Sequence, residues 1–243
     1  MTEILWPVLE LRQYTLRPGT RDTLIDLFDR ELLDPQETLG ARIIGQFRDE
    51  DDPDRFVWLR AFPDMRARHA ALTAFYLDSE TWHTHAPAAR ATMIDTTDVL
   101  LLRPSPPGSG FTAPSDRPAR DATAAPPARV MATVYHPSVD LDEFAGFFDD
   151  RVRPALAAAG IHPVGVYETE PAPNTFAPLP VREGESVFSW FATFADADRR
   201  AAQLAMLIRS PRWRDDVAPE LAKRLEGPEH VLRLAPTARS LLR

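Results

Sequence analysis

The sequence predicts an α+β fold in which one ferredoxin-like unit, a four-stranded antiparallel sheet with helices on one face, occurs twice. The strand-like phrase FVWLRAFPD at residues 56–64 nearly returns as FSWFATFAD at residues 188–196. A proline-rich stretch at residues 104–129 lies between the two phrases and divides the chain of 243 residues into halves of similar length. A repeat on either side of a linker is typical of an internal duplication.

Further matches between the halves keep the same order along the chain. Gly40 and Gly160 are 120 positions apart, whereas Trp58 and Trp190 are 132 positions apart. The change of offset falls at the segment EPAPNTFAPLPVREGE, residues 170–185, which predicts a longer hairpin loop in the second half.

The first half predicts six elements. Its opening strand alternates leucine with polar residues, and a helix follows the Pro18–Gly19 turn with Leu24, Leu27 and Phe28 on one face. The elements are a strand at 8–16, a helix at 17–40, strands at 41–49 and 55–62, a helix at 63–77 and a strand at 98–104. This order is that of a ferredoxin-like unit, and two units can pair their open sheet faces as a barrel with the helices outside.

The duplication divides the chain into three parts. We expect a first unit at residues 1–103, a linker at 104–129 and a second unit at 130–243. The linker has few large apolar residues, so it cannot offset its ordering entropy by burial, and we expect an extended or mobile connector.

Composition excludes several classes of function. A net charge of −8 and a pI near 5.3 argue against a nucleic-acid groove. The absence of cysteine excludes disulfides, thiolate nucleophiles and cysteine-bound metals. No stretch approaches the ~20 apolar residues of a membrane span, and we expect a cytoplasmic protein. Lys223 is the sole lysine and lies in a charged segment, which disfavours Schiff-base chemistry.

Three segments resemble the NIPSNAP family: ELRQYTLRPG at 10–19, the stretch at 39–65, and TMIDTTDVLLLRP at 92–104. The resemblance implies the dimeric α/β-barrel superfamily, here closed within one chain, with one pocket in each half between sheet and helices. The second half lacks the ELRxYT signature, and only its Tyr135 compares with Tyr14. The resemblance therefore implies that the first half is the active one. It leaves the reaction open, because this barrel supports oxygenases, isomerases, cyclases and haem proteins.

The opening strand places Glu10, Arg12 and Tyr14 on one face, because side chains alternate along a strand. One interpretation is a structural Glu–Arg pair with the tyrosine hydrogen-bonded across the barrel interface. The other is a catalytic pair in which Arg12 holds an anionic or carbonyl group and Tyr14 donates a proton.

Glu10 and four further residues are candidates for substrate binding. Strand 55–62 places Trp58 and Arg60 on one face, and the segment ETWHTHAP adds Trp82 and His83 on an expected extended loop. Tryptophans in a pocket favour a planar, apolar ligand, although core packing is the stronger explanation for Trp58, because Trp190 recurs at the matching site.

His85 is the third catalytic candidate, as a neutral acid or base, against the alternative of a surface histidine. We expect no metal, since no third ligand is spaced to complete a set with His83 and His85. No cofactor is predicted. Haem is the alternative, with His69, His83, His85 or His136 as axial ligand.

These features predict a protein that binds a small hydrophobic metabolite. A cofactor-independent enzyme catalysing oxygenation, isomerisation or cyclisation is one hypothesis. The alternatives are a non-catalytic ligand-binding or scaffold protein and a haem-binding protein. A small molecule is the expected partner, with no nucleic acid and no membrane. The chain is expected to be a monomer with a pseudo-dimeric barrel or a homodimer.

Overall fold

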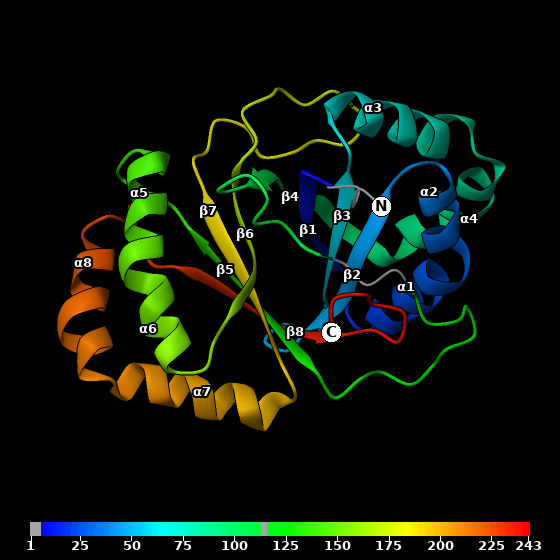
Figure 1. Ribbon diagram of the computed structural model, residues 1–243. Coiled ribbons are helices and arrows are strands. Elements are labelled where there is room, and N and C mark those ends of the chain that lie inside the picture. Colours follow the sequence, from blue (N-terminus) through cyan, green and yellow to red (C-terminus); the bar gives the residue numbers. More distant parts are fainter. Residues whose placement is uncertain (1–5, 113–115) are drawn as a thin grey trace.

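Eight strands close one barrel in the order β1-β3-β2-β8-β5-β7-β6-β4, and every neighbouring pair is antiparallel. Figure 1 shows the computed structural model, which describes residues 6–112 and 116–243. The strands are β1 (Val8–Leu16), β2 (Arg42–Asp49), β3 (Arg55–Phe62), β4 (Met93–Pro104), β5 (Arg129–Tyr135), β6 (Pro163–Thr169), β7 (Phe188–Phe194) and β8 (His230–Pro236).

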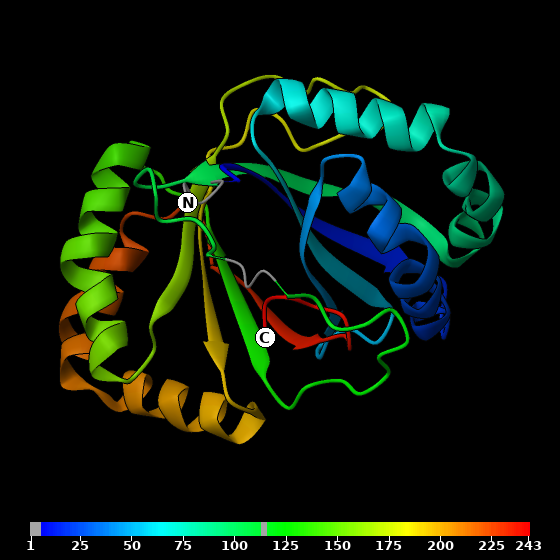
Figure 2. The same ribbon diagram turned by 45° about the vertical axis from the view of Figure 1, so that its right-hand side comes forward.

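The helices lie outside the barrel, in one group for each half (Figures 1 and 2). In the described residues four π-helical segments, η1 to η4, each lie between two α-helices. The first half has α1 (Arg21–Leu27), η1 (Phe28–Leu32), α2 (Leu33–Thr38), α3 (Met65–Thr73), η2 (Ala74–Asp78) and α4 (Glu80–Thr92). The second half has α5 (Leu141–Phe147), η3 (Phe148–Val152), α6 (Arg153–Ala158), α7 (Ala197–Arg209), η4 (Arg212–Val217) and α8 (Ala218–Ala222).

The two halves repeat one topology, which confirms the predicted fold. The first half contributes its strands in the order β4-β1-β3-β2, and the second half contributes the equivalent β8-β5-β7-β6. Two seams join the halves by backbone pairing. At one seam Phe47 of β2 lies opposite Pro236 of β8, and at the other Leu102 of β4 lies opposite Thr169 of β6. The barrel is therefore closed within the chain, without a second copy.

The inside of the barrel is an apolar core shared by both halves. Leu9 and Leu11 of β1 pack there with Val57 of β3 and with Val130 and Leu234 of the second half. Because side chains alternate, the other face of β1 lies under the helices. The predicted division of the strand residues between two faces is thus confirmed, and the polar ones face the helical layer.

Two predicted elements differ from the structure. The expected loop around residues 80–87 is helix α4, which begins where Ser79 accepts a hydrogen bond of 3.4 Å from the backbone of Trp82. Its buried face of Trp82, Ala86 and Ala89 has helical spacing. The long helix expected at 17–40 is interrupted by the π-helical turn η1.

The long connection predicted in the second half crosses to the first. Residues 170–187 join β6 to β7 and lie beside α3, where Arg68 donates hydrogen bonds to Asn174 (2.9 Å) and Thr175 (3.2 Å) (Figure 1). In the first half, residues 50–54 make the same connection as a short turn. The insertion therefore contributes to the surroundings of the other half.

The connector between the halves has neither helix nor strand in its described parts, 105–112 and 116–128. Residues 113–115 of the predicted linker and 1–5 of the first unit lie outside the described residues. Arg117 anchors the connector, with hydrogen bonds to Glu37 (2.6 Å) and to the Arg239 carbonyl (2.7 Å).

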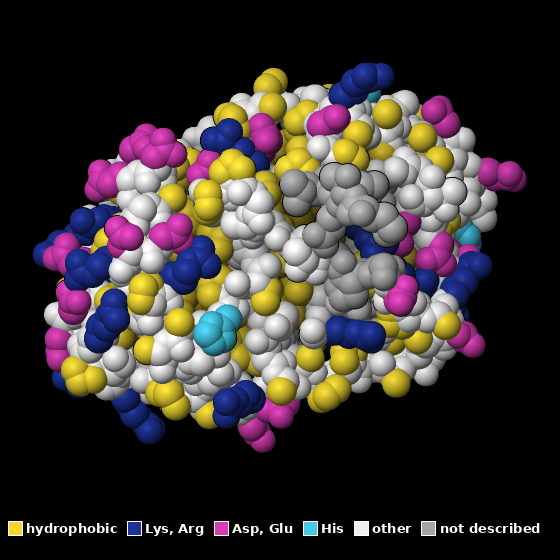
Figure 3. All heavy atoms as spheres, viewed as in Figure 1, with side chains coloured by type: hydrophobic (Ala, Val, Ile, Leu, Met, Phe, Trp, Pro, Cys, Tyr) yellow, Lys and Arg dark blue, Asp and Glu magenta, His cyan; other side chains and the backbone are white. Residues whose placement is uncertain are grey.

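The face seen in Figure 3 carries acidic and basic side chains interspersed, with apolar side chains scattered between them. Within the described residues, none of the helices combines the length and the apolar character needed to cross a bilayer.

Candidate functional site

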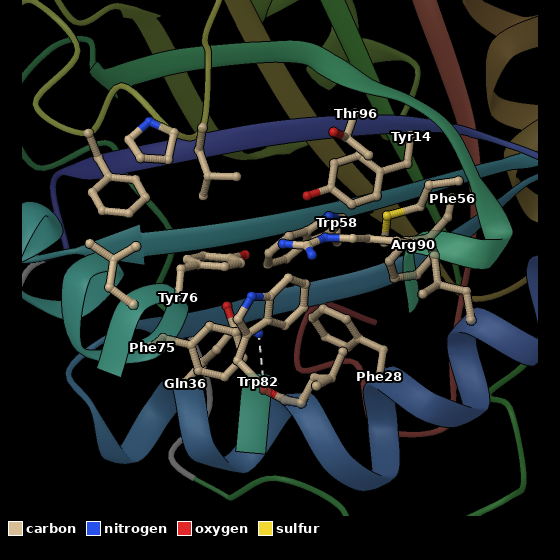
Figure 4. A pocket seen from close by; sticks show the side chains of 17 residues that line it. Tyr14, Phe28, Gln36, Phe56, Trp58, Phe75, Tyr76, Trp82, Arg90 and Thr96 are labelled. Carbon is tan, nitrogen blue, oxygen red and sulfur yellow. Dashed lines mark hydrogen bonds between the residues drawn. The ribbon is translucent and has the colours of Figure 1, made fainter. Parts of the chain in front are cut away.

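A cavity of about 260 Å³ lies between the sheet and the helices of the first half. Its floor is formed by β1 and β3, and its walls come from η1, η2 and α4 (Figure 4). Most of its surface is aromatic or aliphatic. The lining residues are Tyr14, Leu24, Phe28, Leu32, Gln36, Phe56, Trp58, Phe75, Tyr76, Leu77, Trp82, Arg90, Met93, Thr96, Phe176, Pro178 and Leu179.

Three of the lining residues belong to the second half. Phe176, Pro178 and Leu179 lie on the inserted connection between β6 and β7. The ring of Phe176 lies 6.2 Å from that of Tyr76, and its side chain is buried. The cavity of the first half is thus completed by a segment that the first half lacks.

Beside the cavity, Glu10 is surrounded by three arginines. Its carboxylate accepts hydrogen bonds from Arg12 Nη1 (3.0 Å), Arg60 Nη2 (2.7 Å) and Arg68 Nε (2.7 Å), and all four side chains are buried. Burial alone would raise the pKa of Glu10, but the guanidinium groups of Arg60, Arg12 and Arg68 hold it well below its ordinary value. One negative charge thus faces three positive charges, which leaves an excess of two.

Tyr14 receives a hydrogen bond from this cluster and retains its own proton for the cavity. Arg12 Nε donates to the Tyr14 hydroxyl oxygen at 3.1 Å. Burial raises the pKa of Tyr14, so the hydroxyl is neutral at physiological pH. In the same way Arg60 Nη1 donates to Tyr76 at 3.3 Å. The arginines therefore orient both hydroxyl groups as donors.

The second half has lost this cluster. In the first half Glu10 pairs with Arg60 across the β1–β3 ladder. At the matching place in the β5–β7 ladder, Met131 pairs with Ala192. Thr133 stands opposite Trp190, as Arg12 stands opposite Trp58.

On the helical side of the second half, apolar residues occupy the place of the polar cluster, and the pocket expected in that half stays a prediction. Phe144, Phe148, Leu156 and Trp190 belong to this buried apolar cluster. Leu156 lies 120 positions after Gln36 and is therefore its equivalent in the second half. An apolar side chain thus stands where the first half has a polar lining residue.

A tryptophan and a tyrosine occur at matching positions in both halves, with different hydrogen bonding. In the second half Trp190 Nε1 donates to the Tyr135 hydroxyl at 3.2 Å. In the first half Trp58 Nε1 is buried and has no acceptor among the described residues. Tyr135 lies at the position of the β5–β7 ladder that Tyr14 holds in the β1–β3 ladder, as the predicted comparison of the two residues requires. The expected hydrogen bond from Tyr14 across the barrel is wrong, because Tyr14 bonds to Arg12 on its own strand.

The structure brings together part of the predicted site. Tyr14, Trp58 and Trp82 line the cavity, and Glu10, Arg12 and Arg60 lie directly behind it. Sequence reasoning missed the other polar groups, Gln36, Arg68, Tyr76 and Arg90. The sequence held a signal for Arg68. It lies three residues before Ala71 and four before Leu72, which is the spacing of one buried helical face.

The histidines lie elsewhere. His83 is exposed, and His85 Nε2 lies 3.9 Å from Glu31 on the outer surface of the helices. Arg151 and Asp216 form the corresponding ion pair in the second half. The two contacts join equivalent elements, η1 to α4 in the first half and η3 to η4 in the second. The position of His85 is therefore consistent with a structural role in holding two helices together.

The other two candidate haem ligands are also engaged outside the cavity. His69 Nδ1 lies 2.6 Å from the Thr175 carbonyl, and His136 Nε2 lies 3.4 Å from Glu185. Since none of the four histidines lines the cavity, its residues do not fit a histidine-ligated haem. The described residues contain no group of three or more histidine, aspartate or glutamate side chains placed to hold a metal.

The fold is a single-chain α/β barrel, and buried polar side chains lie behind the cavity of its first half. Residues 9–107 match the NIPSNAP family model, which confirms the predicted resemblance for this part of the chain. No curated protein matches the chain significantly.

Solved structures resemble the chain over nearly its whole length. A candidate monooxygenase from Fusobacterium nucleatum superposes with a TM-score of 0.59 at 11% identity, covering 95% of this chain and 92% of that one. A candidate monooxygenase from Lactobacillus acidophilus gives 0.58 at 11% identity, covering 98% and 100%. An anthrone oxidase-like protein gives 0.54 at 12% identity, covering 98% and 94%. At these identities the likeness shows the shared fold.

Proposed function

We propose that the first half binds a small, planar, largely apolar metabolite that carries an oxygen acceptor. The observation that carries the proposal is the unused hydrogen-bond donor of Trp58 in an aromatic cavity, beside a Tyr14 hydroxyl whose proton is also free to be donated. A buried N–H without an acceptor costs about 1–3 kcal/mol, so a ligand oxygen that accepts it gains affinity.

The aromatic lining favours a flat ligand. Phe28 meets Trp58 edge to face at 4.9 Å between ring centroids, and Tyr76 meets Trp82 in the same way at 4.9 Å. These rings restrict the cavity to ligands that present a face or an edge to them.

A catalytic form of this proposal is oxygenation without a cofactor. Donors that hold a ligand oxygen also stabilise negative charge that develops on it, as in an enolate or phenolate. Such electron-rich forms react with dioxygen. The lining residues include no carboxylate or histidine that could take the proton, so the ligand would have to enter already ionised. The oxidase and monooxygenase names of the similar barrels favour oxygenation over isomerisation or cyclisation, and an aromatic ketone is the class of substrate that fits.

Calorimetric titration with 2-naphthol tests the binding proposal. We expect saturable binding at one site per chain. Tyr14→Phe weakens it by about fivefold or more, the equivalent of one hydrogen bond. Tyr135→Phe is the matched control, because it removes a buried hydroxyl from the same register position of the other half. Equal losses in the two variants, or no saturable binding, would contradict the proposal.

A further inference from the structure

The polar groups that face the cavity are mostly hydrogen-bond donors rather than a mixture of donors and acceptors. The lining residues include no aspartate or glutamate. Gln36 has already used its side-chain oxygen, which accepts from Arg60 at 2.8 Å, and its amide, which donates to the Leu32 carbonyl at 3.0 Å. The donors of Tyr14, Tyr76 and Trp58 remain.

Arg90 adds a positive charge to these donors. Its guanidinium carbon lies 5.6 Å from the centroid of the Trp82 ring, and no carboxylate lies within ion-pair distance of it in the described residues. Figure 4 shows the Arg90 side chain, the Tyr14 hydroxyl, the Trp58 indole and the Tyr76 hydroxyl directed toward one region of the cavity.

The buried cluster of Glu10 and three arginines behind this region carries more positive than negative charge. Arg12, Arg60 and Arg68 share the single carboxylate of Glu10. Arg12 Nη2 and Arg68 Nη2 are buried without an acceptor among the described residues. Buried positive charge without a counter-charge is costly, and an anion brought close to it lowers that cost.

Taking these observations together, we infer that the ligand of this cavity carries an anionic oxygen group on its aromatic or apolar body, with Arg90 as its charge partner and Tyr14 and Trp58 as its hydrogen-bond donors. This inference rests on the proposed function and narrows its ligand class. Charge-assisted hydrogen bonds are about twice as strong as neutral ones, so the charge contributes to selection as well as to affinity.

A pair of probes that differ in charge tests the inference. The carboxylate of 2-naphthoate and the amide of 2-naphthamide have nearly the same shape, and both are titrated calorimetrically into the full chain at neutral pH. We expect 2-naphthoate to bind about tenfold more tightly. Arg90→Gln reduces this preference by about threefold or more, whereas Arg66→Gln, an exposed arginine on α3, leaves it unchanged.

The outcomes separate the inference from the proposed function. If the amide binds as tightly as the carboxylate, or if Arg90→Gln leaves the preference intact, the inference is overturned while the aromatic binding site stands. If 2-naphthol, 2-naphthoate and 2-naphthamide all fail to bind, the proposed function itself fails. Binding of 2-naphthoate alone, with loss in Arg90→Gln, supports both.

Discussion

Trp190 donates its indole N–H to the hydroxyl oxygen of Tyr135 at 3.2 Å. The matching indole of Trp58 has no acceptor among the described residues, and the hydroxyl oxygen of Tyr14 accepts instead from Arg12. The tryptophan and tyrosine of the second half are therefore hydrogen-bonded to each other, whereas those of the first half are not. The second half carries threonine at the equivalent position, Thr133.

The two tryptophans should respond differently to replacement by phenylalanine. Trp190→Phe removes a satisfied hydrogen bond, worth about 1 kcal/mol, and lowers the free energy of unfolding without changing ligand affinity. Trp58→Phe removes a donor from the cavity and weakens the binding of 2-naphthoate. Urea unfolding and calorimetry on both variants measure the two effects. Equal losses of affinity would show that the indole of Trp58 is not a ligand donor.

Glu10 should be among the side chains most important for stability. Glu10→Gln removes the one carboxylate that the described residues place among three buried guanidinium groups. Breaking a buried ion pair by removing one partner costs about 3–5 kcal/mol, which urea unfolding would detect. Glu226→Gln, at an exposed position after α8, serves as the control and should unfold like the parent protein. A Glu10→Gln variant of parental stability would contradict the electrostatic account of the cluster.

Glu10 also predicts part of the loss of stability in acid. Burial opposes its ionisation, yet Arg60 and Arg12 hold its pKa below the ordinary value of 4.5. As the pH falls below about 4.5, the unfolded chain takes up a proton that the folded chain refuses, so the free energy of unfolding decreases. The contribution is complete above that pH. Glu10→Gln should show a shallower decrease between about pH 5 and pH 3, and identical acid slopes would exclude Glu10 as a cause.

The inserted connection of the second half should control affinity at the first. Phe176→Ala removes a buried wall of the cavity and is expected to weaken 2-naphthoate binding by about tenfold, since a buried aromatic contact is worth roughly 1–3 kcal/mol. Met206→Ala, on the exposed face of α7, is a control in which a large apolar side chain is truncated away from the cavity. Unchanged affinity in Phe176→Ala would place the ligand away from this wall.

His85 should be dispensable for binding. It contacts Glu31 outside the cavity, so His85→Ala should bind 2-naphthol and 2-naphthoate as the parent does. If a turnover assay is found, this variant should also retain its rate. A large loss of either property would restore the acid–base role that the sequence suggested for this histidine.

Much of the fold was predictable because it depends on local periodicity and on repetition. The alternation in β1 separated Leu9 and Leu11 from Glu10 and Arg12 correctly, and the offset between Trp58 and Trp190 located the insertion. Both signals lie in the linear sequence.

The cavity was less accessible to sequence reasoning because it depends on contacts between distant segments. Phe176 and Tyr76 are 100 positions apart and belong to different halves, so no local pattern joins them. Helix α4 was missed because His83, His85 and Pro87 obscured the helical spacing of its buried residues. The error placed two histidines beside the cavity instead of on the outside of a helix.

The inserted connection has a consequence for how such a barrel can change over time. Two identical subunits must carry identical residues, so any gain at one cavity is imposed on the other. A gene that encodes both copies in tandem escapes this constraint. Here the first half has the Glu10 cluster, whereas the second half lacks it and supplies the inserted connection that lines the cavity of the first half.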